Sequence, residues 1–224
     1  MSKKIVPPQL VLSQDGTHTL YSPAVGEHYH SARGAMGESA YVYIGSGLQW
    51  AEAPRDVLEV GLGSGLNAYL TQLWARRHNV KIEYTALEPY PVPTATLREL
   101  NYWQFLQCEG GDQASWEKLC DAPFGERVQL DATFSLLKKE EPVEQLNVKE
   151  IYDVVYFDAF SPASQPELWD LATFSRVFAA MRPGGVIVTY SATRAAGDLW
   201  KECGIQVERL PGVLGKRQIM RGVK

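Results

Sequence analysis

The segment Leu58–Asn67 constrains the fold of this chain more than any other part of its sequence. An apolar run, Asp56–Val60, predicts a buried strand and leads directly into glycines at the alternate positions 61, 63 and 65. Glycines there let the backbone turn sharply and approach a ligand without a clash from a Cβ atom. The helix expected at Leu66–Arg77 adds unpaired backbone N–H groups at its beginning. Because ligands of open α/β sheets bind beyond the carboxyl ends of the strands, we expect a ligand site at this loop.

Strand-like and helix-like segments alternate from residue 55 to the end of the chain. Repeated strand–helix units indicate a mostly parallel sheet that is covered on both faces. The last two strands are too close in sequence for a parallel crossover, so they should pair as a hairpin. The pattern predicts a Rossmann-like α/β methyltransferase fold, with a mostly parallel seven-stranded sheet and an antiparallel terminal strand. Further strands are expected at 82–87, 127–130, 152–157, 186–190, 206–210 and 217–221, and helices at 94–106, 113–120, 167–181 and 194–203.

The first fifty residues lack the strand–helix alternation of the rest of the chain. Short strand-like runs flank Asp15-Gly16, which is a hairpin-turn signal, and a helix is expected at about Glu38–Ile44. We therefore expect residues 1–50 to form a small N-terminal extension of hairpin and helix that packs on a main domain at 51–224. Within that domain, the charged segment Lys138–Glu150 is expected to be a solvated surface loop.

Composition excludes several classes of protein. The fractions of 45% hydrophobic and 21% charged residues are typical of a globular domain. No apolar run approaches the roughly 18–20 residues that span a bilayer, and Pro7-Pro8 interrupts the start before any signal-peptide core develops, so we expect a cytoplasmic protein. The three cysteines lie far apart, and His28 and His30 lack a third ligand nearby. Neither a disulfide framework nor a metal site is therefore expected.

Acidic residues follow or end three successive expected strands. Glu59 would face a pyrophosphate unfavourably, but it would favour the positive sulfonium and amino groups of S-adenosylmethionine. Glu88 is placed to bind ribose hydroxyls, and Asp131 to accept a hydrogen bond from the adenine amino group. A structural turn with a surface glutamate is the alternative for Glu59, a solvent-facing loop residue before Pro89 for Glu88, and a helix N-cap for Asp131. The expected cofactor site comprises Glu59, Gly61, Gly63, Gly65, Asn67, Glu88, Asp131, Ala132 and Asp158.

The fourth strand of the series delivers a further carboxylate, Asp158, followed by a turn that Pro162 makes rigid. A carboxylate beside the reactive end of the cofactor can accept a hydrogen bond from an amine and align it for in-line displacement at carbon. It also stabilises the positive charge that develops on nitrogen. Asp158 is therefore the expected catalytic residue, and Phe160 is expected to shape a slot for a planar base. A buried structural aspartate is the alternative.

The segment Asp158–Trp169 resembles a known signature. Asp158-Ala-Phe-Ser-Pro followed by Pro166-Glu-Leu-Trp169 is similar to a segment of the bacterial methyltransferases that complete 5-methylaminomethyl-2-thiouridine at the tRNA wobble position. The glycine loop, Thr19–Ser22 and Gly215–Arg217 are also similar to that family. The resemblance thus spans nearly the whole chain, and the Asp158–Trp169 string is its most specific part.

The resemblance implies methylation of the primary amine of 5-aminomethyl-2-thiouridine in tRNA, with S-adenosylmethionine as donor and Asp158 as the catalytic carboxylate. Gln165 stands where the family usually has Asn, and Leu62 and Ser64 where Phe and Thr are common, which affects fine geometry. Many members carry a fused flavin-dependent oxidase that makes the amine, for which a chain ending at Lys224 has no room. The expected partners are therefore tRNA and a separate enzyme or complex that supplies the amine.

Candidate contacts with the RNA come from two parts of the chain. Tyr29 is suited to stacking on a base and His30 to polar contacts, although an ordinary surface loop explains both equally well. Residues 201–224 hold six basic and two acidic residues, so they carry +4, whereas residues 1–200 carry −8. Basic side chains there can bind phosphate, with solvated charge as the alternative. The expected substrate contacts are Tyr29, His30, Phe160, Ser161, Pro162, Lys216 and Arg217.

Two other functions remain open at this stage. A methyl- or aminopropyltransferase that acts on a small-molecule amine would keep the fold, and the net charge of −4 favours it slightly over an RNA enzyme. A non-catalytic RNA-binding module with a relic cofactor pocket is the third reading. The acids at 59, 88, 131 and 158 argue against that reading, because a relic has no need of them.

Overall fold

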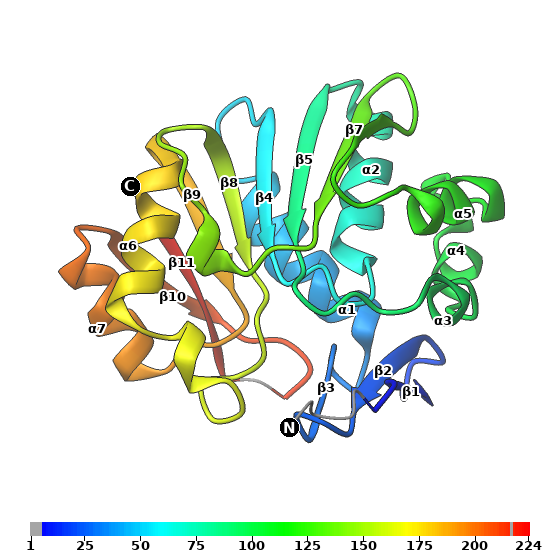
Figure 1. Cartoon of the computed structure of the whole chain (residues 1–224), viewed down its shortest axis with the longest axis horizontal. Helices are drawn as coiled ribbons and strands as arrows, with labels where there is room; N and C mark the ends of the chain where they lie inside the picture. Colours follow the sequence, from blue (N-terminus) through cyan, green and yellow to red (C-terminus); the bar gives the residue numbers. More distant parts are fainter. Residues whose placement is uncertain (1–5, 216) are drawn as a thin grey trace.

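A large mixed β-sheet forms the centre of the molecule in the computed structural model, which describes residues 6–215 and 217–224 (Figure 1). Its strands lie in the order β10-β11-β9-β8-β4-β5-β7-β6. They are β4 (Asp56–Val60), β5 (Ile82–Leu87), β6 (Arg127–Gln129), β7 (Phe134–Lys139), β8 (Tyr152–Phe157), β9 (Met181–Thr189), β10 (Gln206–Pro211) and β11 (Gln218–Val223). The pairs from β9 to β7 are parallel, whereas β11 and β6 run antiparallel to their neighbours. The predicted α/β sheet, mostly parallel and ending in an antiparallel hairpin, is confirmed.

The sheet has eight strands, not the seven expected, and the difference lies between residues 127 and 139. The expected parallel strand at 127–130 is instead the antiparallel edge strand β6, and β7 occupies the place beside β5. Asp131 makes the intervening tight turn, because its carboxylate accepts hydrogen bonds from the backbone N and the hydroxyl of Thr133. Lys138 and Lys139 therefore belong to a strand, and the prediction of a solvated loop was wrong for them.

Helices cover both faces of the sheet, because successive residues of a strand point to opposite faces. Val57 of β4 packs in one core cluster with the helix α2, and the adjacent Leu58 packs in the other cluster with α6 and α7. These helices are α2 (Leu66–His78), α6 (Leu171–Ala180) and α7 (Arg194–Glu202). None of the helices among the described residues is both long and apolar enough to cross a membrane.

The N-terminal residues form a separate small sheet and a helical segment, which lie near the ends of the central strands in Figure 1. The sheet consists of β1 (Gln9–Leu12), β2 (His18–Ser22) and β3 (Glu27–His28). The helix α1 (Ala35–Ser39) continues into a π-helix, η1 (Ala40–Leu48), which packs against α2, β8 and β9. A Cβ atom at Gly47 would lie 2.8 Å from Cγ2 of Val188, so glycine permits this close packing. The helix expected at 38–44 is present within a longer, partly π-helical segment, and the division of the chain at residue 50 stays a prediction.

Two expected helices are interrupted. The helix expected at 94–106 is broken into α3 (Thr94–Arg98) and α4 (Tyr102–Phe105), because the side chain of Asn101 binds the backbone of His18 and Gly16. The helix expected at 167–181 begins only after Asp170, whose carboxylate caps α6 at the backbone N of Thr173. The remaining short elements are η2 (Gln107–Glu109), α5 (Gln113–Asp121), η3 (Val143–Gln145) and η4 (Pro166–Leu168).

Candidate active site

The glycine loop between β4 and α2 lies where the parallel strands end, which we call the carboxyl edge of the sheet. Gly61 has a φ of +91°, and a Cβ atom there would lie 2.7 Å from the backbone O of Asp158. Gly63 has a φ of +51°, and its Cβ atom would lie 2.8 Å from Cδ1 of Tyr29. Any other residue would clash or be strained at both positions. The loop therefore holds β4, β8 and the N-terminal segment close around one space.

Asp158 stands directly after β8 at this edge, with its backbone N bound to the O of Val60 at 2.9 Å. The Tyr43 hydroxyl donates to Oδ1 at 2.5 Å, and the Asn67 amide donates to Oδ2 at 2.7 Å. Burial raises the pKa of Asp158, although His30 and these two hydrogen bonds oppose the rise. Both oxygens are thus held in place and each keeps a lone pair for a further donor.

Asn67 links Asp158 to a second carboxylate, Glu59. The Asn67 amide also donates to Oε1 of Glu59 at 2.9 Å, and Oε2 has no hydrogen-bond partner among the described residues. Glu59 is 0% exposed, and burial together with Asp158 raises its pKa well above the ordinary value. Glu59 therefore acts on the site from behind Asn67 and has no surface of its own there.

Glu88 follows β5 and braces the glycine loop. Its carboxylate accepts hydrogen bonds from the backbone N of Gly63 at 2.9 Å and of Tyr90 at 3.0 Å. Burial raises its pKa, and the two backbone hydrogen bonds oppose the rise. Glu88 also lines a cavity together with Gly63. The structure thus brings Glu88 to the glycine loop, as the sequence predicted.

Glu59, Glu88 and Asp158 share an electrostatic feature. None of the three forms an ion pair with a residue within 6–215 or 217–224. No group of three metal-ligating side chains occurs in the part of the chain that the structure describes. A positively charged ligand would stabilise the ionised form of these buried carboxylates, so the site favours a cation.

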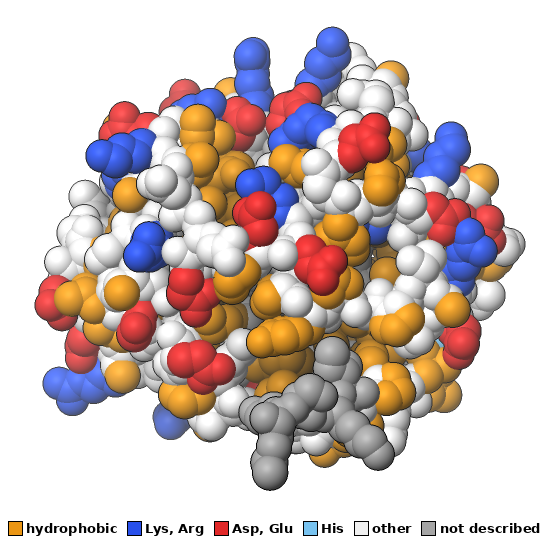
Figure 2. Space-filling model, in the orientation of Figure 1, with side chains coloured by type: hydrophobic (Ala, Val, Ile, Leu, Met, Phe, Trp, Pro, Cys, Tyr) orange, Lys and Arg blue, Asp and Glu red, His pale blue; other side chains and the backbone are white. Residues whose placement is uncertain are grey.

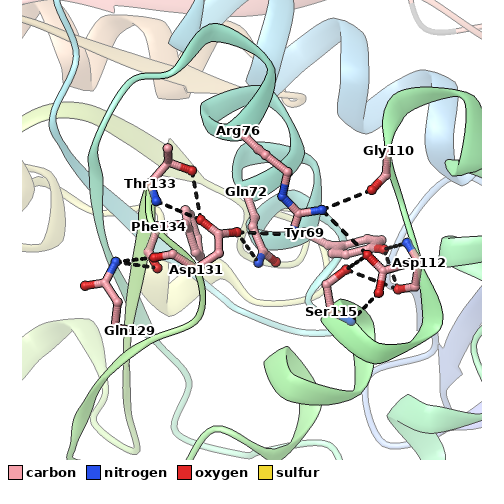
Figure 3. Close-up of polar contacts among 10 residues, drawn as sticks. All are labelled: Tyr69, Gln72, Arg76, Gly110, Asp112, Ser115, Gln129, Asp131, Thr133 and Phe134. Carbon is pink, nitrogen blue, oxygen red and sulfur yellow. Dashed lines mark hydrogen bonds and ion pairs between the residues drawn. The ribbon is translucent and has the colours of Figure 1, made fainter.

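Asp131 and Ala132 lie elsewhere, so their expected role in cofactor binding is wrong. They precede β7 and so lie where the parallel strands begin, whereas Glu88 lies where these strands end. Asp131 is bound there by Gln72 at 2.8 Å and by Arg76 at 3.1 Å (Figure 3). Although burial alone would raise the pKa of Asp131, these hydrogen bonds and those from Thr133 lower it overall. The antiparallel direction of β6 is what carries Asp131 away from the site.

The expected substrate residues of the N-terminal segment are brought to the glycine loop. Tyr29 contacts the ring of Phe160 edge-on, with 5.2 Å between centroids, and burial and Glu88 raise its pKa to about 12. His30 is only 6% exposed, and its Nε2 pairs with the Ser64 hydroxyl at 2.9 Å. Tyr29 and Phe160 thus form an aromatic wall, whereas His30 lies behind the loop and not at its mouth.

The segment after Asp158 is fixed at both ends. The backbone N of Ser161 donates to Glu27 at 3.0 Å, and the Trp169 indole donates to the backbone O of Phe160 at 2.8 Å. Pro162 lines a second, shallow cavity with Trp169 and Thr193. Ser161 and Pro162 thus lie beside the aromatic wall.

Arg217, one of the two basic residues expected to bind phosphate, is exposed in the turn between β10 and β11. The other, Lys216, lies outside the described residues. The turn lies at the same end of the molecule as the N-terminal sheet (Figure 1). On the face drawn in Figure 2, Lys and Arg side chains are interspersed with acids and do not form one continuous patch.

Sequence reasoning missed two residues of this edge. Tyr43 lies within the expected N-terminal helix, and nothing in its local sequence indicates a contact with a residue 115 positions away. Lys138 was assigned to a solvated loop, yet it is 1% exposed and lines the cavity beside Glu88. The one local signal for its burial is the apolar pair Leu136 and Leu137, which precedes it in the same strand.

Known proteins resemble this chain over most of its length. A bifunctional protein of tRNA 5-methylaminomethyl-2-thiouridine biosynthesis, MnmC, from Azoarcus sp. (strain BH72) is 31% identical over 97% of this chain and 36% of its own length. The MnmC of Thiobacillus denitrificans is 30% identical over 98% of this chain and 37% of its own length. The chain therefore spans about a third of the length of these curated relatives. The resemblance carried by Asp158–Trp169 is confirmed.

Solved structures agree on the fold. MNMC2 from Aquifex aeolicus has a TM-score of 0.73 and 23% identity over 98% of this chain and 71% of that chain. Spermidine synthase from Thermotoga maritima has a TM-score of 0.54 and 10% identity over 96% of this chain and 71% of that chain. At these identities the likeness concerns the fold alone. A family model described as S-adenosyl-L-methionine-dependent methyltransferase matches residues 113–224, and the chain therefore belongs to that family.

Proposed function

We propose that the chain methylates the primary amine of 5-aminomethyl-2-thiouridine at the wobble position of tRNA and so forms 5-methylaminomethyl-2-thiouridine. The observation that carries this proposal is the carboxylate of Asp158, which Tyr43 and Asn67 hold against the glycine loop. The MnmC relatives, whose name refers to biosynthesis of that nucleoside, support the choice of substrate.

The loop and its acids fit S-adenosylmethionine. Gly61 and Gly63 let the loop pack closely against Asp158 and Tyr29, and carboxylates without an ion-pair partner favour a cation. When bound, this cofactor supplies a methyl group that the amine nitrogen takes from the sulfonium sulfur, which leaves S-adenosylhomocysteine. Glu88 keeps lone pairs that can accept from ribose hydroxyls. The proposed cofactor residues are Gly61, Gly63, Gly65, Asn67, Glu88 and Asp158, and Glu59 is proposed to act on the cofactor through Asn67.

Asp158 acts on the amine in this proposal. Its oxygens are held by Tyr43 and Asn67, so the remaining lone pairs have fixed directions in which an amine N–H can be bound. The new C–N bond places a positive charge on nitrogen, which the carboxylate stabilises before it or water takes the proton. Because burial raises the pKa of Asp158, the carboxylate is a better proton acceptor than an exposed aspartate.

The proposed contacts with the RNA come from the aromatic wall and from the turn between β10 and β11. Tyr29 and Phe160 offer aromatic surface for the uracil ring, with Ser161 and Pro162 beside it, and His30 supports the loop through Ser64. Arg217 and Lys216 are proposed as phosphate contacts. A separate enzyme or complex is proposed as the source of the amine.

The decisive experiment supplies S-adenosylmethionine with a labelled methyl group to the purified protein. One arm contains tRNA that carries the 5-aminomethyl base, a second contains the same tRNA without it, and a third contains a panel of small amines and polyamines. We expect label only in the first arm, in a nucleoside that digestion and mass spectrometry identify as 5-methylaminomethyl-2-thiouridine. Label that enters only small amines would replace the tRNA substrate with a small-molecule one, and no label in any arm would argue against an active methyltransferase.

A further inference from the structure

A cavity of about 160 Å³ opens beside the glycine loop. No side chain has yet been assigned to bind the adenine base of the proposed cofactor. The walls of the cavity come from the loop, from the segment after Glu88, from α3 and the end of α5, and from β7. They include Gly63, Glu88, Val92, Leu97, Phe124 and Lys138. The lining therefore combines acidic side chains, among them Glu88, with apolar ones.

Lys138 is an unusual lining residue, since it is 1% exposed. Its Nζ donates to the backbone O of Cys120 at 3.1 Å and lies 5.6 Å from the centroid of the Phe124 ring. It forms no ion pair with any residue that the structure describes. An ammonium group has three N–H donors; Cys120 accepts from one and the Phe124 ring faces the group, so hydrogen-bonding capacity remains for a further acceptor. Burying such a group is costly unless something accepts from it.

We propose that Lys138 reads the adenine ring of the cofactor by donating a hydrogen bond from Nζ to a ring nitrogen in this cavity. The proposal rests on the use of S-adenosylmethionine proposed above. Adenine presents ring nitrogens that accept hydrogen bonds, and the apolar side chains of Val92 and Leu97 suit its faces. Lys138 thus stands at the carboxyl edge, where Asp131 was expected and is absent.

A neutral ring fits this cavity better than an anion does. A phosphate or carboxylate in it would gain from the single cation of Lys138, but it would also face Glu88 and Asp121. Asp121 already binds Arg98 at 2.6 Å, so that arginine is not free to compensate. Burial lowers the pKa of Lys138 to about 8, which leaves it mostly protonated at neutral pH and able to donate.

The test measures the affinity for S-adenosylhomocysteine by calorimetry in the wild type, in Lys138→Met and in Lys139→Met. Methionine keeps the length of the side chain and removes its donors. Lys139 is the matched control, because it is the next residue of β7, points to the other face and binds Glu141 at 3.2 Å. We expect about a tenfold weaker affinity for Lys138→Met, as for one hydrogen bond from a charged donor, with an unchanged or higher melting temperature. The control should bind like the wild type.

Analogues of S-adenosylhomocysteine with a 1-deaza, 3-deaza or 7-deaza base make the test independent of how the variant folds. The wild type should bind one of the three about tenfold more weakly than the parent, and Lys138→Met should lose that distinction. Equal affinity of Lys138→Met and wild type for the parent ligand, or equal losses for the analogues in both proteins, would overturn the reading of the base by Lys138. If the wild type bound no S-adenosylhomocysteine, the cofactor proposal itself would fail, which is a separate outcome.

Discussion

Acidic residues at the two edges of the central sheet have opposite environments. At the carboxyl edge, Glu59, Glu88 and Asp158 make no ion pair with a described residue, and burial raises the pKa of each. At the opposite edge, where the parallel strands begin and which we call the amino edge, Asp131 binds Arg76, and Asp153 binds Arg182 at 2.7 Å. The pKa values of Asp131 and Asp153 are lowered, because hydrogen bonds and arginines there outweigh the opposing effect of burial.

The difference separates residues that stabilise the fold from residues available to a ligand. A carboxylate with an arginine partner is satisfied in the folded chain and needs nothing further. A buried carboxylate without a cation is costly to the fold, and perturbed pKa values of this kind gather at functional sites. The contrast therefore predicts that charge-removing substitutions at the carboxyl edge change binding and turnover, whereas those at the amino edge change stability.

The largest effect is expected for Asp158→Asn. The substitution keeps the shape of the side chain but removes the charge that stabilises the developing ammonium, so turnover should fall about a hundredfold or more. Affinity for S-adenosylhomocysteine should stay within about tenfold of the wild type, because Glu88 and the glycine loop are untouched. Methyl transfer to the tRNA substrate and calorimetry measure the two quantities.

The matched control is Asp131→Asn at the amino edge, which should turn over like the wild type. If both variants lost turnover alike, the contrast between the edges would carry no functional meaning. Normal turnover of Asp158→Asn would remove Asp158 from the proposed mechanism.

The affinities of Glu88→Gln and Asp131→Asn for S-adenosylhomocysteine test the same contrast for the cofactor. An amide cannot accept from both Gly63 and Tyr90 and also from ribose hydroxyls, so the affinity for S-adenosylhomocysteine should weaken about tenfold. Asp131→Asn should leave this affinity unchanged. A loss of affinity in Asp131→Asn would mean that the adenine is read near Asp131 after all.

The sequence predicted most of the residues at the carboxyl edge, but few of the residues that surround them. The glycine loop and Asp158 each follow an apolar strand directly, so the end of the strand sets their position. Asp131 lies at the amino edge because β6 runs antiparallel to β7. The two strands are joined by a hairpin turn, whereas a parallel pair would need a crossover helix. No periodic pattern distinguishes a three-residue antiparallel strand from a parallel one.

Tertiary contacts explain the remaining failures. In the sequence, Lys138 and Lys139 look like the beginning of a charged loop. Lys138 is buried because β7 pairs with β5 and because its side chain forms part of the cavity wall. Tyr43 meets Asp158 because η1 packs across β8 and β9, which its own sequence does not encode locally. Residues that reach a site from a distant segment are therefore the part that sequence patterns miss.

Tyr43→Phe tests how the carboxyl edge keeps Asp158 ionised. The hydroxyl donates to Oδ1, and its loss raises the pKa of Asp158 further, because a donor to the carboxylate favours the charged form. The acid limb of the pH profile of kcat/KM should therefore move to higher pH, and kcat should fall by roughly threefold to tenfold, the scale of one such hydrogen bond. Tyr69→Phe is the control, since its hydroxyl binds the backbone of Asp112. An unshifted acid limb in Tyr43→Phe would show that this hydrogen bond does not tune Asp158.

The smallest effects are on stability, and the two edges should differ in sign. The pKa of Asp153 is lowered in the folded chain, so its contribution is present above the unfolded value and is lost as the pH falls through the folded value. The stability deficit of Asp153→Asn, about 1–2 kcal/mol at pH 7, should therefore shrink as the pH falls below about 4. The pKa of Glu88 is raised in the folded chain, so the wild type loses stability as the pH rises above the unfolded value. The difference in the free energy of unfolding between the wild type and Glu88→Gln should therefore shift in favour of the variant over that range. Urea unfolding of the three proteins between pH 3 and 7 measures both trends, and slopes of the same sign would contradict the contrast between the edges.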